Sequence, residues 1–90
     1  MIPYGRQDIT DEDIDAFKTV LQSDFLTQGS ALPEFENSIC EYTHARHAIG
    51  VNSGTSALHL ACRAMGLSKG DTLWTPAITF ASSANCGLFC

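Results

Sequence analysis

Apolar residues recur at helical spacing early in the chain, where Ile14, Phe17 and Leu21 would share one face of a helix. The tetrapeptide Thr10-Asp11-Glu12-Asp13 before this stripe resembles a capping box, in which side chains of the first turn bond backbone N–H groups that lack partners. We therefore predict a helix over residues 11–22.

A second apolar stripe follows Pro33, a residue suited to the first turn of a helix. Phe35, Ile39 and Tyr42 mark this stripe, and they predict a second helix. Residues 23–30 must then form a loop between the two helices.

The second half of the chain predicts a strand, a helix and a strand. Residues 47–51 form a short apolar run typical of a buried strand, and residues 72–75 form another, ended by Pro76. Between them a helix is predicted after Gly54, and Gly66 stands where a helix C-terminus favours glycine. The apolar stripe of this helix comprises Ala57, Leu60, Ala61, Ala64 and Met65. This order predicts an α/β fold with parallel strands and a right-handed crossover, with ligands at the carboxyl ends of the strands.

Composition limits the possible partners. The net charge is −5 and only five Lys and Arg are spread along the chain, so there is no basic patch for nucleic acid or an anionic membrane. Charged residues make up 17% of the chain against a usual ~25%. Residues 72–90 carry no charge, yet the run is interrupted and too short for a membrane span. We expect this run to be buried core whose partners are missing.

The four cysteines are expected to be free thiols. No export signal precedes the chain's first helix, so a cytoplasmic location is the default expectation, and the cytosol keeps thiols reduced. Cys86 and Cys90 are four residues apart, but one pair without a second is a poor zinc signature. We therefore expect no metal site.

The turn Gly54-Thr55-Ser56 is the candidate site for a phosphate. The first backbone N–H groups of a helix have no intrahelical partners, and together with the positive end of the helix dipole they attract an anion. The same residues also suit an ordinary helix cap, and the turn alone does not decide between the two interpretations.

Several further segments resemble a known family when taken in chain order. They are Ile2-Pro3-Tyr4-Gly5-Arg6-Gln7, Asp24-Phe25-Leu26-Thr27-Gln28-Gly29, Phe35-Glu36, Gly70-Asp71 and Thr75-Pro76-Ala77-Ile78-Thr79-Phe80-Ala81-Ser82. Together with the serine-rich turn, they resemble the DegT/DnrJ/EryC1/StrS family of pyridoxal-phosphate-dependent nucleotide-sugar aminotransferases. The opening and Trp74-Thr75-Pro76 are most similar to the branch that works in pseudaminic acid biosynthesis.

The resemblance implies a fold and an assembly. The fold is the large domain of a fold type I, aspartate aminotransferase-like enzyme, of which this chain would be the N-terminal fragment. Residues 1–30 would form an N-terminal arm, a helix and a substrate loop, and residues 31–90 would begin the cofactor-binding α/β domain. The complete enzyme would be a cytoplasmic homodimer.

The resemblance also assigns site residues. Those expected to bind pyridoxal 5′-phosphate are Gly54, Thr55, Ser56 and Phe80, the last by stacking on the ring. Those expected to bind the nucleotide sugar are Tyr4, Asp24, Phe25, Leu26, Thr27, Gln28 and Gly54. Without the family, Phe80 would be a core aromatic and the loop a plain connection. Ser30 departs from the Pro or basic residue usual in the family, which bears on the loop's shape.

The implied reaction moves an amino group, from glutamate, to the 4-keto carbon of a UDP-linked 4-keto-6-deoxy-N-acetylhexosamine. It needs a Schiff-base lysine, which the family carries beyond residue 90. Lys18 and Lys69 lack a desolvating setting, so no catalytic residue is assigned, and the fragment alone is expected to be inactive. Two alternatives remain: a dehydratase of the same family, and a non-catalytic phosphate-binding module.

Overall fold

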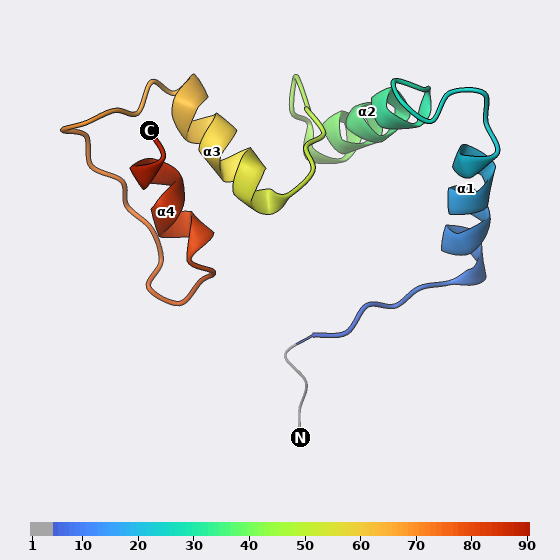
Figure 1. Cartoon of the computed structure of the whole chain (residues 1–90), viewed down its shortest axis with the longest axis horizontal. Coiled ribbons are helices and arrows are strands. Elements are labelled where there is room, and N and C mark those ends of the chain that lie inside the picture. The colour runs from blue at the N-terminus through green and yellow to red at the C-terminus, as the bar shows by residue number, and fades with distance from the viewer. Residues whose placement is uncertain (1–4) are drawn as a thin grey trace. The chain divides into compact units, whose positions relative to one another are not determined.

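The computed structural model describes residues 5–90, and the predicted substrate contact Tyr4 lies outside the described residues. The chain divides into two compact units between Ile49 and Gly50. The first contains helices α1 (Asp11–Leu21) and α2 (Ala31–Thr43), and the second contains α3 (Gly54–Ala64) and α4 (Ser82–Leu88) (Figure 1). The expected functional division after residue 30 stays a prediction.

A complete capping box begins α1. The Thr10 hydroxyl accepts a hydrogen bond from the Asp13 backbone N–H at 3.3 Å, and the Asp13 carboxylate accepts one from the Thr10 backbone N–H at 2.8 Å. Each side chain thereby satisfies a donor at the helix start. The helix ends at Leu21, one residue before the predicted end, so the prediction is confirmed.

The capping box makes helix α1 sensitive to acid. The hydrogen bonds from the Thr10 backbone N–H and hydroxyl lower the pKa of the Asp13 carboxyl. A carboxyl whose pKa is lowered by folding stabilises the folded form above its unfolded pKa of about 3.9, and this contribution is lost as pH falls through the folded pKa. We expect the Cα chemical shifts of residues 11–14 to keep helical values from pH 7 to 5 and to move toward coil values below about pH 4.

The matched controls for this prediction are Asp13→Asn and Asp15→Asn. Asp15 makes no side-chain bond to Thr10, so Asp15→Asn should keep the acid-dependent change, whereas Asp13→Asn should remove most of it. Equal acid responses in the two variants would contradict a role for the Asp13 carboxylate in the cap.

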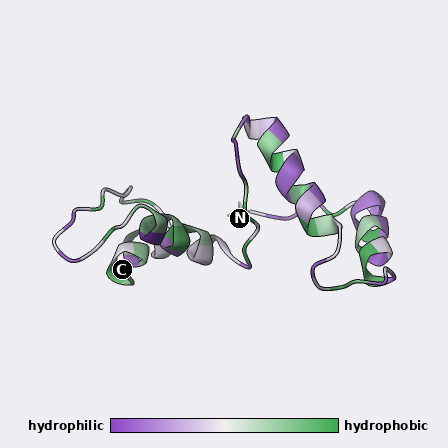
Figure 2. Ribbon diagram, turned by 90° about the horizontal axis from the view of Figure 1, so that it is seen from above, coloured by the Kyte–Doolittle hydropathy of each residue, from purple (hydrophilic) through white to green (hydrophobic). Residues whose placement is uncertain are grey.

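Helix α2 confirms the second predicted helix, with Pro33 in its first turn and a left-handed His44 (φ 58°) after its last residue. Its apolar stripe does not form a core. Tyr42 is 88% exposed and Phe35 is 56% exposed, and among the described residues of the first unit no side chain is buried. Figure 2 shows hydrophobic and hydrophilic positions alternating along these helices. The helices of this unit therefore present apolar faces that no described residue covers.

Helix α3 ends in a two-bond C-terminal motif, as Gly66 predicts. The Gly66 N–H donates to the Arg63 carbonyl and the Leu67 N–H donates to the Cys62 carbonyl, both at 3.0 Å. This pattern is the Schellman motif, which needs a left-handed residue after the helix, and Gly66 has φ 78°. The prediction for this end of the helix is confirmed.

The two predicted strands do not form. Residues 47–51 and 72–75 have no strand structure, and the described part of the chain contains helices, turns and irregular segments only. An extended segment becomes a strand when its backbone groups pair with a neighbouring strand. Neither segment has such a neighbour within residues 5–90. The α/β arrangement expected from the sequence is therefore not seen in the described part of the chain.

The small core of the second unit lies between α3 and α4, the helix that the sequence did not predict. Cys62 on α3 and Cys86 on α4 are 4% and 2% exposed, and Ser82 is also buried. His59 packs edge-on against Phe89, with ring centroids 5.5 Å apart. These contacts use one side of α3, the side that carries His59 and Cys62.

The predicted apolar stripe of α3 is therefore not its buried face. Ala57, Leu60, Ala61, Ala64 and Met65 are all exposed. The packing partner of α3 in this unit is α4, which occupies the adjacent side of the helix and leaves the stripe uncovered. Of the described helices, none is long and apolar enough to cross a membrane.

Candidate functional site

The N-terminus of α3 is organised by three polar side chains. Ser53 has extended backbone geometry (φ −163°, ψ 155°), and its hydroxyl accepts a hydrogen bond from the Ser56 backbone N–H at 3.2 Å. The Ser56 hydroxyl in turn donates to Asn52 Oδ1 at 2.8 Å and lies 3.0 Å from the Ser53 hydroxyl. The ordinary cap interpretation is therefore correct for Ser53.

The cap leaves other donors at the same helix end available. The backbone N–H groups of Gly54 and Thr55 occupy the first two helical positions, which have no intrahelical acceptor. Thr55 is half-buried, and its hydroxyl makes no hydrogen bond to a described residue. These three donors lie at the positive end of the helix dipole. The arrangement can accept an anion while Ser53 keeps its capping role.

Gly54 has an open surrounding. A Cβ atom built on Gly54 would meet nothing within 4 Å, and the residue has no positive φ. Neither packing nor backbone conformation within the described residues requires glycine here. One physical reason for a glycine at this position remains, which is the close approach of a ligand to the backbone.

Asn52 is the residue that the sequence reasoning missed. Its side-chain oxygen holds the Ser56 hydroxyl, so that hydroxyl is already committed and the Thr55 hydroxyl is the side-chain donor left for a ligand. An Asn directly before a Ser cap was the available signal, because short amide side chains bond to groups a few residues away.

Phe80 lies in the same unit, directly before α4. Its ring is 77% exposed and has no aromatic partner among the described residues, while its carbonyl accepts a hydrogen bond from the Ser83 N–H at 3.0 Å. Within the described residues the Phe80 side chain is therefore unpacked. Whether this ring stacks on a cofactor stays a prediction.

The predicted substrate loop, residues 24–28, lies in the first unit and is tightly built. The Ser23 hydroxyl is 2.7 Å from the Val20 carbonyl and 3.3 Å from the Phe25 carbonyl. Gln28 is left-handed, with φ 58°. A Cβ atom on Gly29 would lie 2.5 Å from the Phe25 carbonyl oxygen, closer than real Cβ atoms approach. The loop therefore has a defined shape that a larger residue at Gly29 would change.

The side chains of the loop are exposed, and two of them are large and apolar. Phe25 is 71% exposed and Leu26 is 64% exposed, and Asp24, Thr27 and Gln28 are exposed as well. All five predicted contacts of the loop are thus accessible to a ligand. The loop lies in the first unit, and the α3 N-terminus lies in the second.

The remaining polar groups do not form a further centre. Lys18 and Lys69 are exposed, and within the described residues no group of three His, Cys, Asp or Glu side chains could hold a metal ion.

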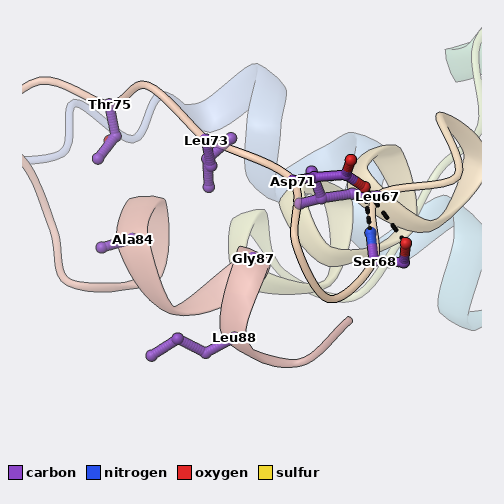
Figure 3. A pocket seen from close by; sticks show the side chains of 8 residues that line it. All are labelled: Leu67, Ser68, Asp71, Leu73, Thr75, Ala84, Gly87 and Leu88. Atoms are coloured by element: carbon purple, nitrogen blue, oxygen red, sulfur yellow. Dashed lines mark hydrogen bonds between the residues drawn. The ribbon is translucent and has the colours of Figure 1, made fainter.

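A pocket of about 290 Å³ lies beside the turn that precedes residues 72–75 (Figure 3). There the Asp71 carboxylate accepts hydrogen bonds from the Ser68 N–H at 2.8 Å and hydroxyl at 3.3 Å. None of the predicted cofactor residues lines this pocket.

Comparison with known proteins gives the family. Residues 7–89 match the DegT/DnrJ/EryC1/StrS aminotransferase family. Two similar proteins are each called UDP-4-amino-4,6-dideoxy-N-acetyl-beta-L-altrosamine transaminase. One, from Campylobacter jejuni subsp. jejuni serotype O:23/36, is 47% identical over 88 residues, and the other, from serotype O:2, is 44% identical over 88 residues.

These alignments cover 98% of this chain but 23% of each relative, so the chain spans about a quarter of their length. No solved structure matches the chain. The family implies a pyridoxal-phosphate-dependent fold type I aminotransferase. With nearly its whole length matched, the chain belongs to the DegT/DnrJ/EryC1/StrS aminotransferase family.

Proposed function

We propose that this chain is the N-terminal segment of an aminotransferase that makes a UDP-linked 4-amino-4,6-dideoxy sugar. The enzyme would move an amino group from glutamate to the 4-keto carbon of a UDP-4-keto-6-deoxy-N-acetylhexosamine in the pathway to pseudaminic acid. The observation that carries the proposal is the 44–47% identity to two transaminases of that specificity across 98% of the chain.

The residues at the α3 N-terminus suit the phosphate of pyridoxal 5′-phosphate. The N–H groups of Gly54 and Thr55 and the Thr55 hydroxyl are donors at a helix N-terminus, and Ser56 shapes the turn through Asn52. The exposed Phe80 ring offers a flat apolar face to the cofactor ring. When bound, the cofactor supplies the electron sink that amino-group transfer needs.

The loop of residues 24–28 suits a nucleotide sugar. Exposed Phe25 and Leu26 offer apolar surface, and Asp24, Thr27 and Gln28 offer donors and acceptors for sugar hydroxyls. Ser23 and Gly29 hold this loop in one shape. In the complete enzyme, the backbone of Gly54 would also approach the substrate.

The rest of the catalytic domain would complete the fold. Residues 47–51 and 72–75 would become parallel strands once neighbouring strands pair with them, giving the α/β large domain of fold type I. The exposed stripe of α3 would then pack on the sheet, because parallel sheets are covered by helices on both faces. Catalysis would use a lysine from that remainder, and the enzyme would be a homodimer.

The test uses a completed enzyme, defined as this segment joined to the remainder of the catalytic domain of a Campylobacter jejuni relative. Incubation with pyridoxal phosphate, glutamate and the UDP-4-keto sugar should yield a UDP-4-amino sugar and one 2-oxoglutarate per amino group moved. Loss of a sugar hydroxyl without 2-oxoglutarate would indicate a dehydratase instead. Binding of the cofactor with no turnover would indicate a phosphate-binding module.

Substitution of Gly29 tests the substrate loop. In the completed enzyme, Gly29→Ala forces a methyl group against the Phe25 carbonyl, an overpacking that costs about 1–3 kcal/mol if the loop cannot move. We expect the loop to shift and KM for the nucleotide sugar to rise, while kcat changes little. Steady-state kinetics with the UDP-4-keto sugar as the varied substrate measures both.

Gly5→Ala is the matched control, because a Cβ atom at Gly5 meets nothing within 4 Å. It should leave KM unchanged. An unchanged KM in Gly29→Ala, with normal expression, would mean that the loop's shape does not govern substrate binding.

A further inference from the structure

Two buried thiols meet between α3 and α4. Cys62 donates a hydrogen bond to Cys86, with the two Sγ atoms 3.6 Å apart, and both side chains are buried in the second unit. The two residues are 24 positions apart in the chain, so their contact depends on the packing of the two helices. Both are free thiols in this structure.

The separation is short enough for a covalent bond. A disulfide has an S–S distance of about 2.05 Å, so the two sulfurs would need to approach by about 1.5 Å to form one. The Cys86 Sγ also donates to the Ser83 carbonyl at 3.3 Å, and the half-buried Cys90 Sγ donates to the Cys86 carbonyl at 3.4 Å. Cys40, the fourth thiol, lies in the other unit.

Burial makes this pair slow to react. Loss of contact with water raises the pKa of the Cys62 thiol, and the neighbouring Cys86 raises it further. Because the thiolate is the reactive species, the raised pKa of the Cys62 thiol slows its reaction with peroxide. Disulfide formation between the two thiols would therefore need prolonged exposure to the oxidant.

We propose that Cys62 and Cys86 form a disulfide between α3 and α4 when the protein is exposed to hydrogen peroxide. One thiolate attacks a peroxide oxygen, the O–O bond breaks, and a sulfenic acid and hydroxide form. The second thiolate attacks that sulfur, the S–O bond breaks, and the S–S bond forms as hydroxide leaves. The two thiol protons convert the two hydroxides to water, so two sulfurs are oxidised and one peroxide is reduced.

The disulfide would join the two helices next to the candidate cofactor-binding residues. Helix α3 begins at Gly54 and helix α4 follows Phe80. A bond between residues 62 and 86 would restrict how these helices move relative to each other. Oxidation of Cys62 and Cys86 would therefore change the geometry that the second unit can adopt.

Peptide mapping of the full chain tests the proposal. Trypsin cleaves after Lys18, Arg46, Arg63 and Lys69, among other sites. Cys40 therefore lies in the peptide 19–46, Cys62 lies in 47–63, and Cys86 and Cys90 lie in 70–90. After peroxide treatment in native buffer and alkylation of remaining thiols, we expect 47–63 joined to 70–90, with the loss of two hydrogen atoms. In Cys90→Ala the same crosslink should persist, which assigns it to Cys86.

The same treatment in concentrated urea is the reference. An unfolded chain favours the shortest loop, so the Cys86–Cys90 disulfide within one peptide should replace the 47–63 to 70–90 crosslink. Cys62→Ala should abolish the crosslink, whereas Cys40→Ala should not affect it. If the native chain gives the same mixture as the chain in urea, or if Cys90→Ala abolishes the crosslink, the proposal is wrong.

Discussion

Thr55→Ala in the completed enzyme is expected to weaken binding of pyridoxal 5′-phosphate by roughly 1–3 kcal/mol, the range for a hydrogen bond to a charged group or an unsatisfied polar group. That range is a loss of about fivefold to 150-fold in affinity. The physical reason is that the Thr55 hydroxyl is the side-chain donor left at the α3 N-terminus, since Asn52 already holds the Ser56 hydroxyl. The measurement is the cofactor dissociation constant, from the absorbance of the bound cofactor during titration.

Two variants separate a phosphate role from a structural one. Thr55→Ser keeps the hydroxyl and should bind nearly as the unchanged protein does. In Gly54→Ala the added Cβ atom meets no atom within 4 Å, so the variant should be more stable by about 0.4–1 kcal/mol because the unfolded chain loses conformational entropy. The same methyl group lies beside the N–H donors, so the variant should bind the cofactor less tightly. A purely structural role for Gly54 would not produce a variant that is more stable and yet binds the cofactor less tightly. Unchanged cofactor affinity in both Thr55→Ala and Gly54→Ala would mean that the turn is an ordinary helix cap and does not bind the phosphate.

Local signals predicted the start of α1 and both ends of α3. The capping box at Thr10 and Asp13 and the glycine motif at Gly66 involve residues at most five positions apart. Their hydrogen bonds depend on a few consecutive dihedral angles, so a short sequence pattern contains nearly all the information they need. The Ser53 cap is of the same kind.

Non-local partners decided what the sequence could not predict. Residues 47–51 and 72–75 have strand composition, yet a strand needs a neighbour to pair with. The apolar stripe at Ala57 and Ala61 was identified as a stripe, but which face is buried depends on what packs against it. Helix α4 lacked a signal because its cap residue is Ala81, without a side-chain cap bond. The strand pairing and the buried face of α3 therefore depend on residues far away in sequence, whereas α4 was missed for want of a local cap.

The candidate site divides in the same way. The α3 N-terminus was predictable because a strand-like run, a Ser cap and a Gly lie next to each other. Gly29 could be recognised as a loop glycine, but its approach to the Phe25 carbonyl required coordinates. The Cys62–Cys86 contact joins residues 24 apart and had no sequence signature at all.

The 90-residue chain alone is expected to lack a sharp unfolding transition. Within the described residues, the apolar side chains of α1, α2 and α3 are largely exposed, among them Phe17, Tyr42 and Leu60. Among the described residues the buried apolar side chains are Cys62 and Cys86 alone, too few for a cooperative core.

Circular dichroism at 222 nm during heating, with size-exclusion chromatography, measures this. The helical signal of the chain should decline gradually, and the uncovered apolar patches should cause association that increases with concentration. The completed enzyme supplies the strands and helices that cover these faces, so it should elute as one species and unfold in a single steep transition. Helix formation at the chain's local caps does not depend on that cover, so both proteins should start with α1 and α3 formed. A monodisperse monomer of the 90-residue chain with a steep transition would mean that these faces need no partner, and the proposed packing of α3 on a sheet would be wrong.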